Sequence, residues 1–171
     1  MLSRFLRHDP GALGLTLQPG GWVRVEDLLG ALAARGVHVT RERLAEVVEN
    51  NDKQRFAFDT TGERIRANQG HSAPVDLQLS PVSPPRVLYH GTSEARVEAI
   101  LVGGLRAMSR HHVHLSVDVE TARRVGARHG RPVILEVDAG GLHAAGFVFF
   151  RSENGVWLTD HVPPAFLRVL A

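Results

Sequence analysis

The sequence contains no cysteine, a single lysine and no apolar run of 18 residues. Without cysteine the chain forms no disulfide and no thiolate metal site, which fits a reducing compartment. Without a long apolar run it has no segment able to span a membrane. The first residues, MLSRFLRHDPG, lack the apolar stretch of a secretory signal. We therefore expect a cytoplasmic protein with no membrane partner.

The common nucleotide and zinc fingerprints are missing as well. Neither G-x-x-x-x-G-K-S/T nor G-x-G-x-x-G occurs, so P-loop and Rossmann folds lack support. There is no H-E-x-x-H, and together with the absence of cysteine this predicts no metal site. The 20 cationic side chains are all arginine except Lys53. This bias reflects either genomic base composition or the use of guanidinium forks to grip phosphate groups.

The chain divides where proline is concentrated. The stretch SAPVDLQLSPVSPPR, residues 72–86, contains several prolines and no helical period, which is typical of a linker. We expect lobes over 1–72 and 86–171, joined by a linker over 73–85. The apolar fraction of 43% is normal for a globular protein that buries a core.

The first lobe is mostly helical in pattern. Apolar spacing predicts helices over 2–8, 25–34 and 40–51, with Gly36 ending the second and Thr40 capping the third. The segments RFAFD and ERIRA, separated by TTG, predict a β-hairpin. Helices followed by a hairpin suggest a winged-helix lobe.

Short strands dominate the second lobe. Residues with β-branched and aromatic side chains predict strands at RVLYH, HVHLS, PVILEV, GFVFF and GVWLT. Two helices, SEARVEAILVGG and DVETARRVGARHG, fit between them, and parallel units would need more crossover helices than this. We therefore expect an α+β protein whose second lobe is a compact, mostly antiparallel sheet with two helices.

Several motifs of the first lobe carry cationic side chains suited to phosphate. Arg7 and His8 are neighbours on a helix, so both can edge one pocket, although such pairs are also common on solvated faces. Arg55 follows the polar turn NNDKQ and is either a phosphate ligand at a strand end or an ordinary surface arginine. Arg64 and Arg66 lie on one strand face beside the small polar QGHS, and this arrangement suits an anion.

The motifs of the second lobe suit a polar ligand. In YHGTS, Gly91 lets the backbone approach a ligand, and the amides that begin the next helix face it. SRHHVHLS puts His112 and His114 on one side of a strand and His111 on the other. Neutral histidines that bind a hydroxyl-rich ligand fit this motif better than a metal, because further ligands are absent. RSENGVWLT predicts a polar turn before an apolar strand, as in a plain hairpin.

Taken in order, these motifs resemble those of the RNA (tRNA) 2′-phosphotransferase family. The match runs from about residue 2 to residue 168, through LRHDP, NDKQRF, IRANQGHS, LYHGTS, SRHHVHLS, VGARHGRPV and ENGVWLT. IRANQGHS and HHVHLS are specific to that family, whereas HGT with ILVGGLR is similar to ADP-ribosyltransferases generally. The resemblance implies an N-terminal winged-helix RNA-binding lobe and a C-terminal ADP-ribosyltransferase lobe. Relatives carry a longer first helix, so we expect a short helix under Arg7 and His8.

The resemblance also implies an NAD⁺-dependent RNA 2′-phosphotransferase that acts in tRNA splicing or RNA repair. An internal RNA 2′-phosphate attacks the anomeric carbon of the nicotinamide riboside and expels nicotinamide, which gives an ADP-ribosylated RNA. The neighbouring 2″-hydroxyl then attacks phosphorus, giving 2′-OH RNA and ADP-ribose 1″,2″-cyclic phosphate. NAD⁺ is consumed as a co-substrate, and no metal is needed because arginines stabilise the charge. The expected partners are NAD⁺ and a tRNA-like RNA with a 2′-phosphate, and we expect a monomer.

The resemblance places the family's essential side chains by motif match, on Arg7, His8, Arg55 and Arg110. Arg128 competes for the fourth place or binds the pyrophosphate, and His8 either orients the phosphate or shuttles a proton. Arg64 and Arg66 are expected to bind RNA. The implied NAD⁺ pocket consists of His90, Gly91, Thr92, Gly104, Arg106, His114, Leu115, Ser116, Arg128 and Val156. Val156 stands where many ADP-ribosyltransferases hold a glutamate, and a phosphate nucleophile needs no such carboxylate.

Three other classes of protein fit parts of the pattern. The first is a non-catalytic RNA- or ADP-ribose-binding module, which the joint presence of all four matched side chains opposes. The second is an ADP-ribosyltransferase that acts on a protein or a terminal nucleic-acid phosphate and stops after the first step. The third is a winged-helix DNA regulator. It is disfavoured because the helix over 40–51 carries glutamates that offset its arginines.

Overall fold

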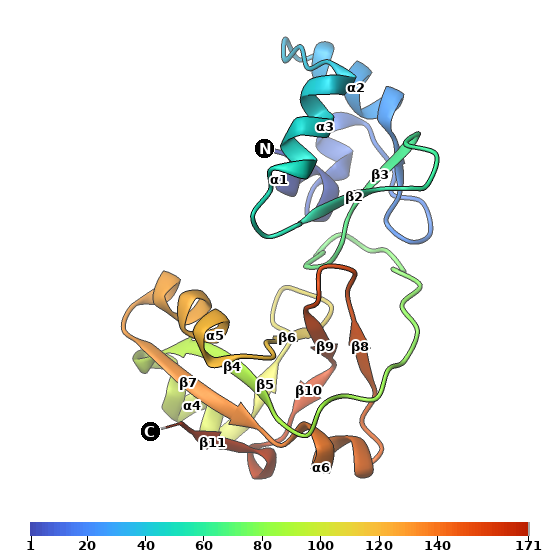
Figure 1. Ribbon diagram of the computed structural model, residues 1–171. Helices are drawn as coiled ribbons and strands as arrows, with labels where there is room; N and C mark the ends of the chain where they lie inside the picture. The colour runs from blue at the N-terminus through green and yellow to red at the C-terminus, as the bar shows by residue number, and fades with distance from the viewer. Residues whose placement is uncertain (171) are drawn as a thin grey trace. The chain divides into compact units, whose positions relative to one another are not determined.

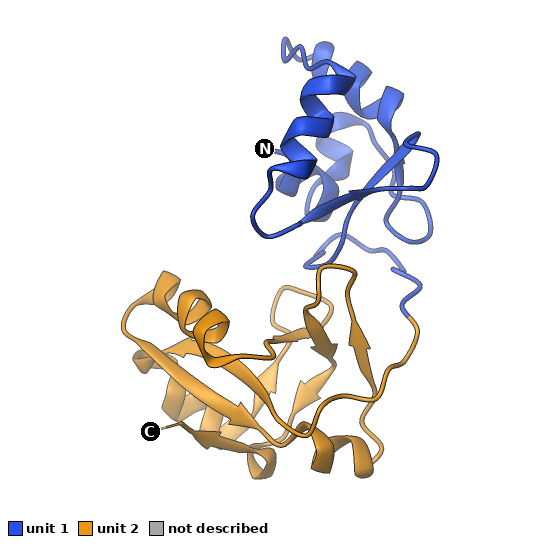
Figure 2. Cartoon of the chain, viewed as in Figure 1, with its two compact units in different colours: residues 1–79 blue, residues 80–171 orange. Residues whose placement is uncertain are grey.

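The computed structural model describes residues 1–170, which form two compact units (Figure 2). Unit 1 comprises Met1–Leu79, and unit 2 begins at Ser80. The change from one unit to the other lies inside the proline-containing segment 73–85. The bounds 1–72 and 86–171 for two functional lobes stay predictions.

Unit 1 combines three α-helices and one 3₁₀-helix with a small antiparallel sheet (Figure 1). Its helices are α1 (Leu2–Arg7), η1 (Pro10–Leu13), α2 (Val25–Ala33) and α3 (Arg41–Glu49). Its strands are β1 (Val23–Arg24), β2 (Phe56–Phe58) and β3 (Arg64–Ala67), in the order β1-β3-β2. Both strand pairings are antiparallel. The helices and the hairpin predicted for this part of the chain are confirmed.

The local signals that predict these elements act as expected. The Thr40 hydroxyl accepts a hydrogen bond of 3.1 Å from the Arg43 amide and so caps α3. Gly36 follows α2 with a φ of 79°, the left-handed conformation that commonly ends a helix. The apolar helix faces close over the sheet in a core that includes Leu6, Leu28, Leu32, Leu44 and Ile65. This core fixes α1 and β3, whose ends carry the site described below.

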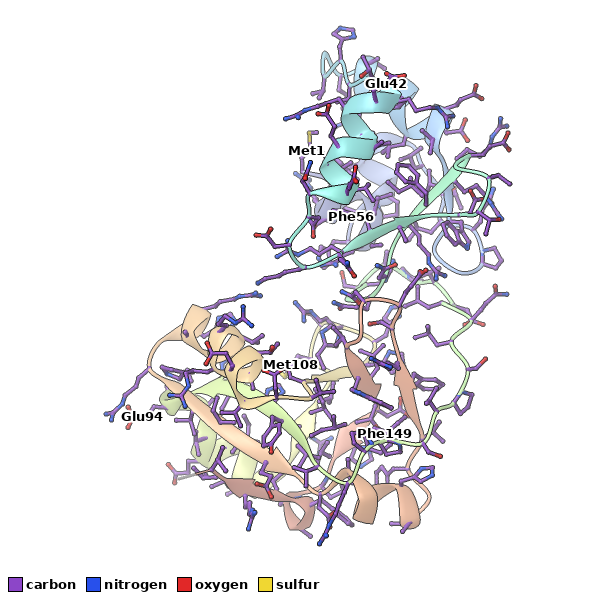
Figure 3. All side chains as sticks on the ribbon, viewed as in Figure 1. Met1, Glu42, Phe56, Glu94, Met108 and Phe149 are labelled. Atoms are coloured by element: carbon purple, nitrogen blue, oxygen red, sulfur yellow. The ribbon has the colours of Figure 1, made fainter. Side chains whose placement is uncertain are left out.

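Unit 2 contains three small antiparallel sheets and the helices that pack on them (Figure 1). Its strands are β4 (Leu88–Ser93), β5 (Leu105–Arg106), β6 (Val113–Leu115), β7 (Pro132–Val137), β8 (Phe149–Arg151), β9 (Trp157–Thr159), β10 (His161–Val162) and β11 (Leu167–Val169). The sheets have the orders β11-β7-β4, β6-β9-β8 and β10-β5. Its helices are α4 (Glu94–Gly103), α5 (Val119–Gly126), η2 (Ala127–His129), α6 (Ala139–Ala144) and η3 (Pro164–Phe166). The buried core includes Leu88, Leu135 and Phe149, the last labelled in Figure 3.

Two expectations for unit 2 are wrong: residues 80–170 form three sheets instead of one, and three α-helices instead of two. The sequence does not predict α6, because two glycines in AGGLHA oppose helix formation. The helix forms because the Asp138 side chain accepts from the Gly141 amide at 2.9 Å. In addition, the Gly140 amide donates to the carbonyl of Arg86 at 2.9 Å. Capping and tertiary contact therefore replace intrinsic propensity.

Helix α5 crosses β4 at Gly91. A Cβ on Gly91 would overlap the carbonyl oxygen of Ala122 and lie 2.9 Å from the Gly126 amide nitrogen. The close approach of the α5 backbone is thus a structural reason for glycine at this position, and the assignment of Gly91 to a ligand pocket stays a prediction. The first amide of α4, from Glu94, is also engaged, since it donates to the Arg131 carbonyl at 3.0 Å. Over residues 1–170, no helix is long and apolar enough to cross a membrane.

Candidate active site

Two distant motifs of unit 1 meet at the end of α1. The Arg7 carbonyl accepts hydrogen bonds from the amides of Ser72 and Ala73, each 2.9 Å long. His8, the residue after the helix, places its ring Nδ1 2.8 Å from Ser72 Oγ, although the two residues are 64 positions apart. The LRHD and NQGHS motifs are thus parts of one local structure.

Arg7 is buried rather than solvated. It is only 8% exposed, and its guanidinium carbon lies 6.0 Å from the centre of the Phe56 ring, which Figure 3 labels on β2. An aromatic face stabilises a cation that has lost part of its water. The alternative of a solvated helix face is therefore wrong for Arg7, whereas His8 is exposed.

Arg55 lies directly before β2, and the backbone on both sides of it is held. Its amide donates to Asn51 Oδ1 at 3.1 Å, and its carbonyl accepts from the Asn68 amide at 2.9 Å. Asn68 also donates through Nδ2 to the Gln54 carbonyl at 2.6 Å. Gln54 has a φ of 42°, a left-handed conformation that is uncommon outside glycine. These contacts fix the backbone from which the Arg55 side chain extends.

Arg64 and Arg66 share one face of β3, as expected, because both contact the ring of Trp22. Their guanidinium carbons lie 5.4 and 4.5 Å from the ring centre. Arg64 Nε donates to Asp59 at 2.8 Å, and this bond holds the pKa of the Asp59 carboxyl far below its usual range. Arg66 Nη1 donates to the Gly20 carbonyl at 3.3 Å. The stacked arrangement presents two cations and an aromatic ring together.

The histidines of unit 2 gather where β4 meets the end of β6. Tyr89 and Ser116 exchange two backbone hydrogen bonds of 2.8 Å, which join the two segments. His90 Nδ1 lies 3.0 Å from the carbonyl oxygen of His114. Arg110 Nη1 lies 2.9 Å from His114 Nδ1. We call His90, His114 and Arg110 the His-Arg set; it connects the YHGTS and SRHHVHLS motifs.

Hydrogen bonding places the proton on each ring of this set. A carbonyl only accepts, so His90 Nδ1 carries a hydrogen and Nε2 is an acceptor. Burial lowers the pKa of His90, so this ring is neutral at pH 7. A guanidinium only donates, so His114 accepts from Arg110 at Nδ1 and carries its proton at Nε2. One imidazole acceptor and one imidazole donor suit a ligand rich in hydroxyl groups.

The other residues of SRHHVHLS have different surroundings. His112 packs edge-on to Phe150, with ring centres 5.5 Å apart, and its Nε2 lies 4.0 Å from Asp160. Desolvation lowers the pKa of His112 despite that carboxylate, so this ring also favours its neutral form. Arg110 is exposed in a turn in which its amide donates to the Ala107 carbonyl at 3.1 Å.

Several residues of the implied NAD⁺ pocket serve the fold directly. Thr92 and Leu115 are buried, the latter in the core of unit 2. Gly104 has a φ of 80°, and a Cβ there would overlap the Val162 carbonyl oxygen. A backbone of this shape requires glycine whether or not a ligand is near. Arg106, on β5, is exposed and paired in register with β10.

Arg128 and Val156 lie outside the His-Arg set. Arg128 is exposed on η2, and its side chain makes no hydrogen bond or ion pair within residues 1–170. Val156 is half-buried and lies between β8 and β9. These two strands pair as a hairpin, which confirms the predicted turn. Its amide donates to Oγ of the buried Ser152 at 3.0 Å. The structure therefore brings Arg110, rather than Arg128, into contact with a histidine of the set.

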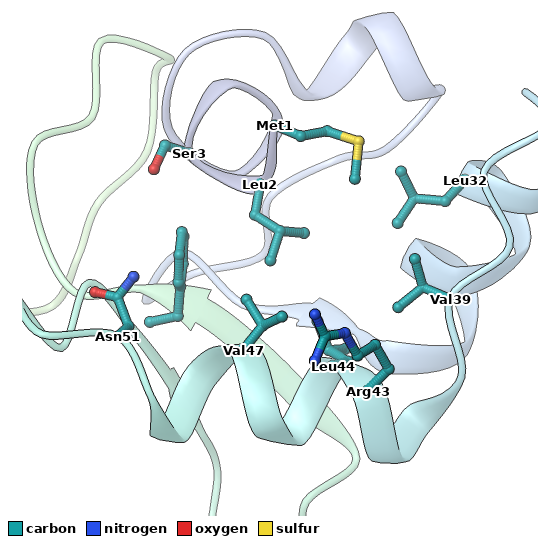
Figure 4. Close-up of a pocket in the computed structure, with 10 residues that line it drawn as sticks. Met1, Leu2, Ser3, Leu32, Val39, Arg43, Leu44, Val47 and Asn51 are labelled. Carbon is teal, nitrogen blue, oxygen red and sulfur yellow. The ribbon is translucent and has the colours of Figure 1, made fainter.

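Two further features bear on ligand binding. Among residues 1–170, no group of three or more His, Asp or Glu side chains is arranged to hold a metal ion. A cavity of about 360 Å³ opens in unit 1 (Figure 4), but it includes none of the predicted site residues. Its lining is mostly apolar: Met1, Leu2, Ser3, Leu32, Val39, Arg43, Leu44, Val47, Asn51 and Phe56. Such a lining does not suit a dinucleotide or an RNA phosphate.

Sequence reasoning does not identify the residues that hold the site. Ser72, Asn51 and Asn68 make the contacts that join the motifs of unit 1. All three lie in the polar stretches NNDKQ and ANQGHS. The only signal for them is a small polar side chain beside a cationic motif, and this signal is also that of an ordinary turn.

The fold defines a two-unit α+β protein, and each unit contains a polar cluster with arginine and histidine side chains. A family model for "RNA 2′-phosphotransferase, Tpt1 / KptA family" matches residues 1–161. The chain therefore belongs to this family and is a transferase.

Individual relatives agree with the family model. The chain is 60% identical to a "Probable RNA 2′-phosphotransferase" of Trichormus variabilis, over 99% of this chain and 93% of the relative. It is 58% identical to a protein of the same name from Herpetosiphon aurantiacus, over 98% of this chain and 92% of the relative. It is 57% identical to a protein of the same name from Streptomyces coelicolor, over 98% of this chain and 91% of the relative.

Proposed function

We propose that this chain is an NAD⁺-dependent RNA 2′-phosphotransferase. It transfers an internal 2′-phosphate of RNA to NAD⁺, and the products are 2′-OH RNA, ADP-ribose 1″,2″-cyclic phosphate and nicotinamide. The observation that carries this proposal is the His-Arg set, found in a chain that belongs to the RNA 2′-phosphotransferase family. Neutral imidazoles beside a guanidinium suit a ligand that has both hydroxyl and phosphate groups.

In this proposal unit 1 is a winged-helix RNA lobe and unit 2 is an ADP-ribosyltransferase-like NAD⁺ lobe. The three α-helices and the three-stranded antiparallel sheet of unit 1 support the first assignment. The small antiparallel sheets of unit 2, with α4 directly after β4, support the second. The lobes extend over 1–72 and 86–171, and 73–85 links them.

In the first step an oxygen of the RNA 2′-phosphate forms a bond to the anomeric carbon of the nicotinamide riboside. The carbon–nitrogen bond breaks, and nicotinamide leaves with the bonding electrons. A phosphate monoester is mostly anionic at pH 7, so no strong base is required. The protein's task is to position two anionic substrates, and Arg7 and Arg55 bind the RNA phosphate for this purpose. The product is the ADP-ribosylated RNA.

In the second step the 2″-hydroxyl attacks phosphorus, and the bond from phosphorus to the RNA 2′-oxygen breaks. The hydroxyl loses its proton and the departing 2′-oxygen gains one. Negative charge grows on the phosphoryl oxygens, and Arg55 and Arg110 stabilise it. His8 either orients the phosphate or moves the proton. Arg128 remains the other candidate for the place given to Arg110.

The NAD⁺ substrate is held by unit 2. His90 Nε2 accepts from a ribose hydroxyl and His114 Nε2–H donates to one, as their ring protons allow. The other residues assigned to the NAD⁺ pocket are Gly91, Thr92, Gly104, Arg106, Leu115, Ser116, Arg128 and Val156. An apolar side chain at Val156 suits a nucleophile that is already an anion. In unit 1, Arg64 and Arg66 bind the RNA beside Trp22.

The direct test is product analysis after mixing the protein with NAD⁺ and an RNA that carries one internal 2′-phosphate. We expect 2′-OH RNA, the cyclic phosphate and nicotinamide in equal amounts. Accumulation of ADP-ribosylated RNA without the cyclic phosphate would instead identify an ADP-ribosyltransferase. Binding of RNA or ADP-ribose without release of nicotinamide would identify a non-catalytic module.

We propose further that the protein works as a monomer in the cytoplasm, on a tRNA-like RNA that has a 2′-phosphate. The absence of cysteine fits a reducing compartment. Arginine forks supply the charge stabilisation that a metal provides in other phosphoryl-transfer enzymes, so the reaction is expected to need no metal.

A further inference from the structure

Ser72 contacts two consecutive residues of the candidate active site. Its amide donates to the Arg7 carbonyl at 2.9 Å, and its Oγ lies 2.8 Å from Nδ1 of His8. The next amide, from Ala73, donates to the same carbonyl at 2.9 Å. One short segment therefore holds both the backbone of Arg7 and the ring of His8.

Hydrogen bonds hold the backbone on both sides of the contact between Ser72 and His8. The Arg7 carbonyl belongs to the last turn of α1, where helix carbonyls lack partners within the helix, so the two amides cap it. The His8 amide in turn donates to the Arg4 carbonyl at 2.9 Å, which fixes the His8 backbone. The serine hydroxyl is one carbon from this fixed backbone, so a single torsion, χ1, brings Oγ to 2.8 Å from the imidazole.

The backbone of residues 68–72, which leads to Ser72, is held by hydrogen bonds and by a glycine turn. Asn68, at its start, binds the backbone of Gln54 and Arg55. Gly70 has a φ of 85° and is buried, so the chain turns there in a conformation that favours glycine. Ser72 is exposed, and its substitution removes a hydroxyl without opening the core. A test at this position therefore leaves the fold in place.

We propose that Ser72 is a positioning residue that fixes the orientation of the His8 ring. With Nδ1 engaged by the serine, Nε2 is the ring nitrogen directed to the RNA 2′-phosphate. The role resembles that of the group that orients a catalytic histidine in hydrolases, with a hydroxyl in place of a carboxylate. The inference that Nε2 serves the reaction rests on the proposed function, whereas the effect of Ser72 on the ring does not.

The first measurement is the χ1 rotamer population of His8, read from three-bond scalar couplings in the full chain without substrate. Ser72→Ala should spread the His8 ring over several rotamers, and Ser72→Thr should retain the wild-type population. The matched control is Ser83→Ala, which removes a hydroxyl 3.5 Å from Nε2 of His143 in unit 2. An unchanged His8 rotamer population in Ser72→Ala would overturn the proposal.

The second measurement is turnover with NAD⁺ and 2′-phosphorylated RNA. Ser72→Ala should lower kcat about tenfold, as expected for the loss of one orienting hydrogen bond, and leave the KM for NAD⁺ unchanged. Ser72→Thr should recover most of the rate, and Ser83→Ala should match the wild type. A rise in KM alone would show a binding role and contradict the proposal. If the wild-type protein produced no cyclic phosphate, the proposed function would fail, whereas the rotamer result would still decide the role of Ser72.

Discussion

The two units hold their cationic residues by different means. In unit 1 the backbone around Arg7 and Arg55 is clamped by loop amides and asparagine side chains, and Arg7 itself is buried over Phe56. In unit 2 the exposed Arg110 is held through its own side chain, by a bond to His114. Strand pairing in turn positions that histidine.

This difference leads us to expect different roles for the three arginines in the proposed reaction. Backbone clamps preorganise Arg7 and Arg55 before a ligand arrives, which suits capture of a phosphate. A side chain held by one hydrogen bond can exchange that bond for a ligand oxygen at little cost. We therefore expect Arg110 to respond to bound NAD⁺ and RNA, whereas Arg55 keeps its place in the free protein.

The largest expected effect comes from removing these arginines. Arg55→Ala and Arg110→Ala should each slow the second step about a hundredfold or more, because growing charge on phosphorus loses its donor. The ADP-ribosylated RNA should then accumulate, visible as a shifted band on labelled RNA followed over time. Lysine at either position should rescue only partly, since a point charge lacks the bidentate fork.

Two matched substitutions sharpen this result. Arg96→Ala removes an exposed arginine of α4 that has no assigned role and should leave both steps unchanged. Arg128→Ala tests the competing candidate. If Arg128→Ala accumulates the intermediate and Arg110→Ala does not, the fourth essential arginine is Arg128. If both Arg55→Ala and Arg110→Ala stop before the first step, these residues serve binding and the assignment of roles is wrong.

The next effect concerns the stability of unit 2. Gly91→Ala should lower the free energy of unfolding of unit 2 by about 3 kcal/mol, because the new methyl group overlaps the backbone of α5 at Ala122. Denaturant titration and amide hydrogen exchange measure this loss, which should be confined to residues of unit 2. Gly103→Ala is the control, since its Cβ would meet no atom within 4 Å. Equal stability of the two variants would contradict the observed crossing of α5 and β4.

A smaller effect is the pH dependence of that stability. Burial lowers the pKa of His90 and of His112 below the ordinary value of 6.5. As the pH falls through about 6.5, the unfolded chain takes up protons that the folded chain does not, so folding weakens. Stability should therefore rise from pH 5 to pH 7, measured as the melting temperature of unit 2. Replacing both histidines with glutamine should flatten this rise, and a slope that stays the same would assign it to other groups.

The smallest expected effect is that of chelation. Cyclic phosphate should form at the same rate in EDTA, because arginines neutralise the phosphate in the proposed mechanism. The rate is compared with and without EDTA, and then after adding back Mg²⁺, Mn²⁺ or Zn²⁺ in turn. Complete loss in EDTA that one of these ions restores would show that a metal takes part.

The sequence by itself determined the elements that local interactions dictate. The helix after Thr40, the turn at Gly36 and the hairpin around residues 60–62 follow from capping, backbone freedom and alternation within a few residues. The family resemblance rests on motifs in their order along the chain, and the family model confirms it.

Only the tertiary structure decided how those motifs meet. Some elements depend on partners remote in the sequence, so no local pattern predicts them. These elements are helix α6 and strands β5, β10 and β11. The same holds for the packing of α5 on Gly91, because it brings together residues about 30 positions apart. It holds for Ser72 too, because a polar turn residue and a residue that orients a histidine have the same sequence signal. Long-range packing separates the two cases, since it alone brings positions 8 and 72 within hydrogen-bond distance.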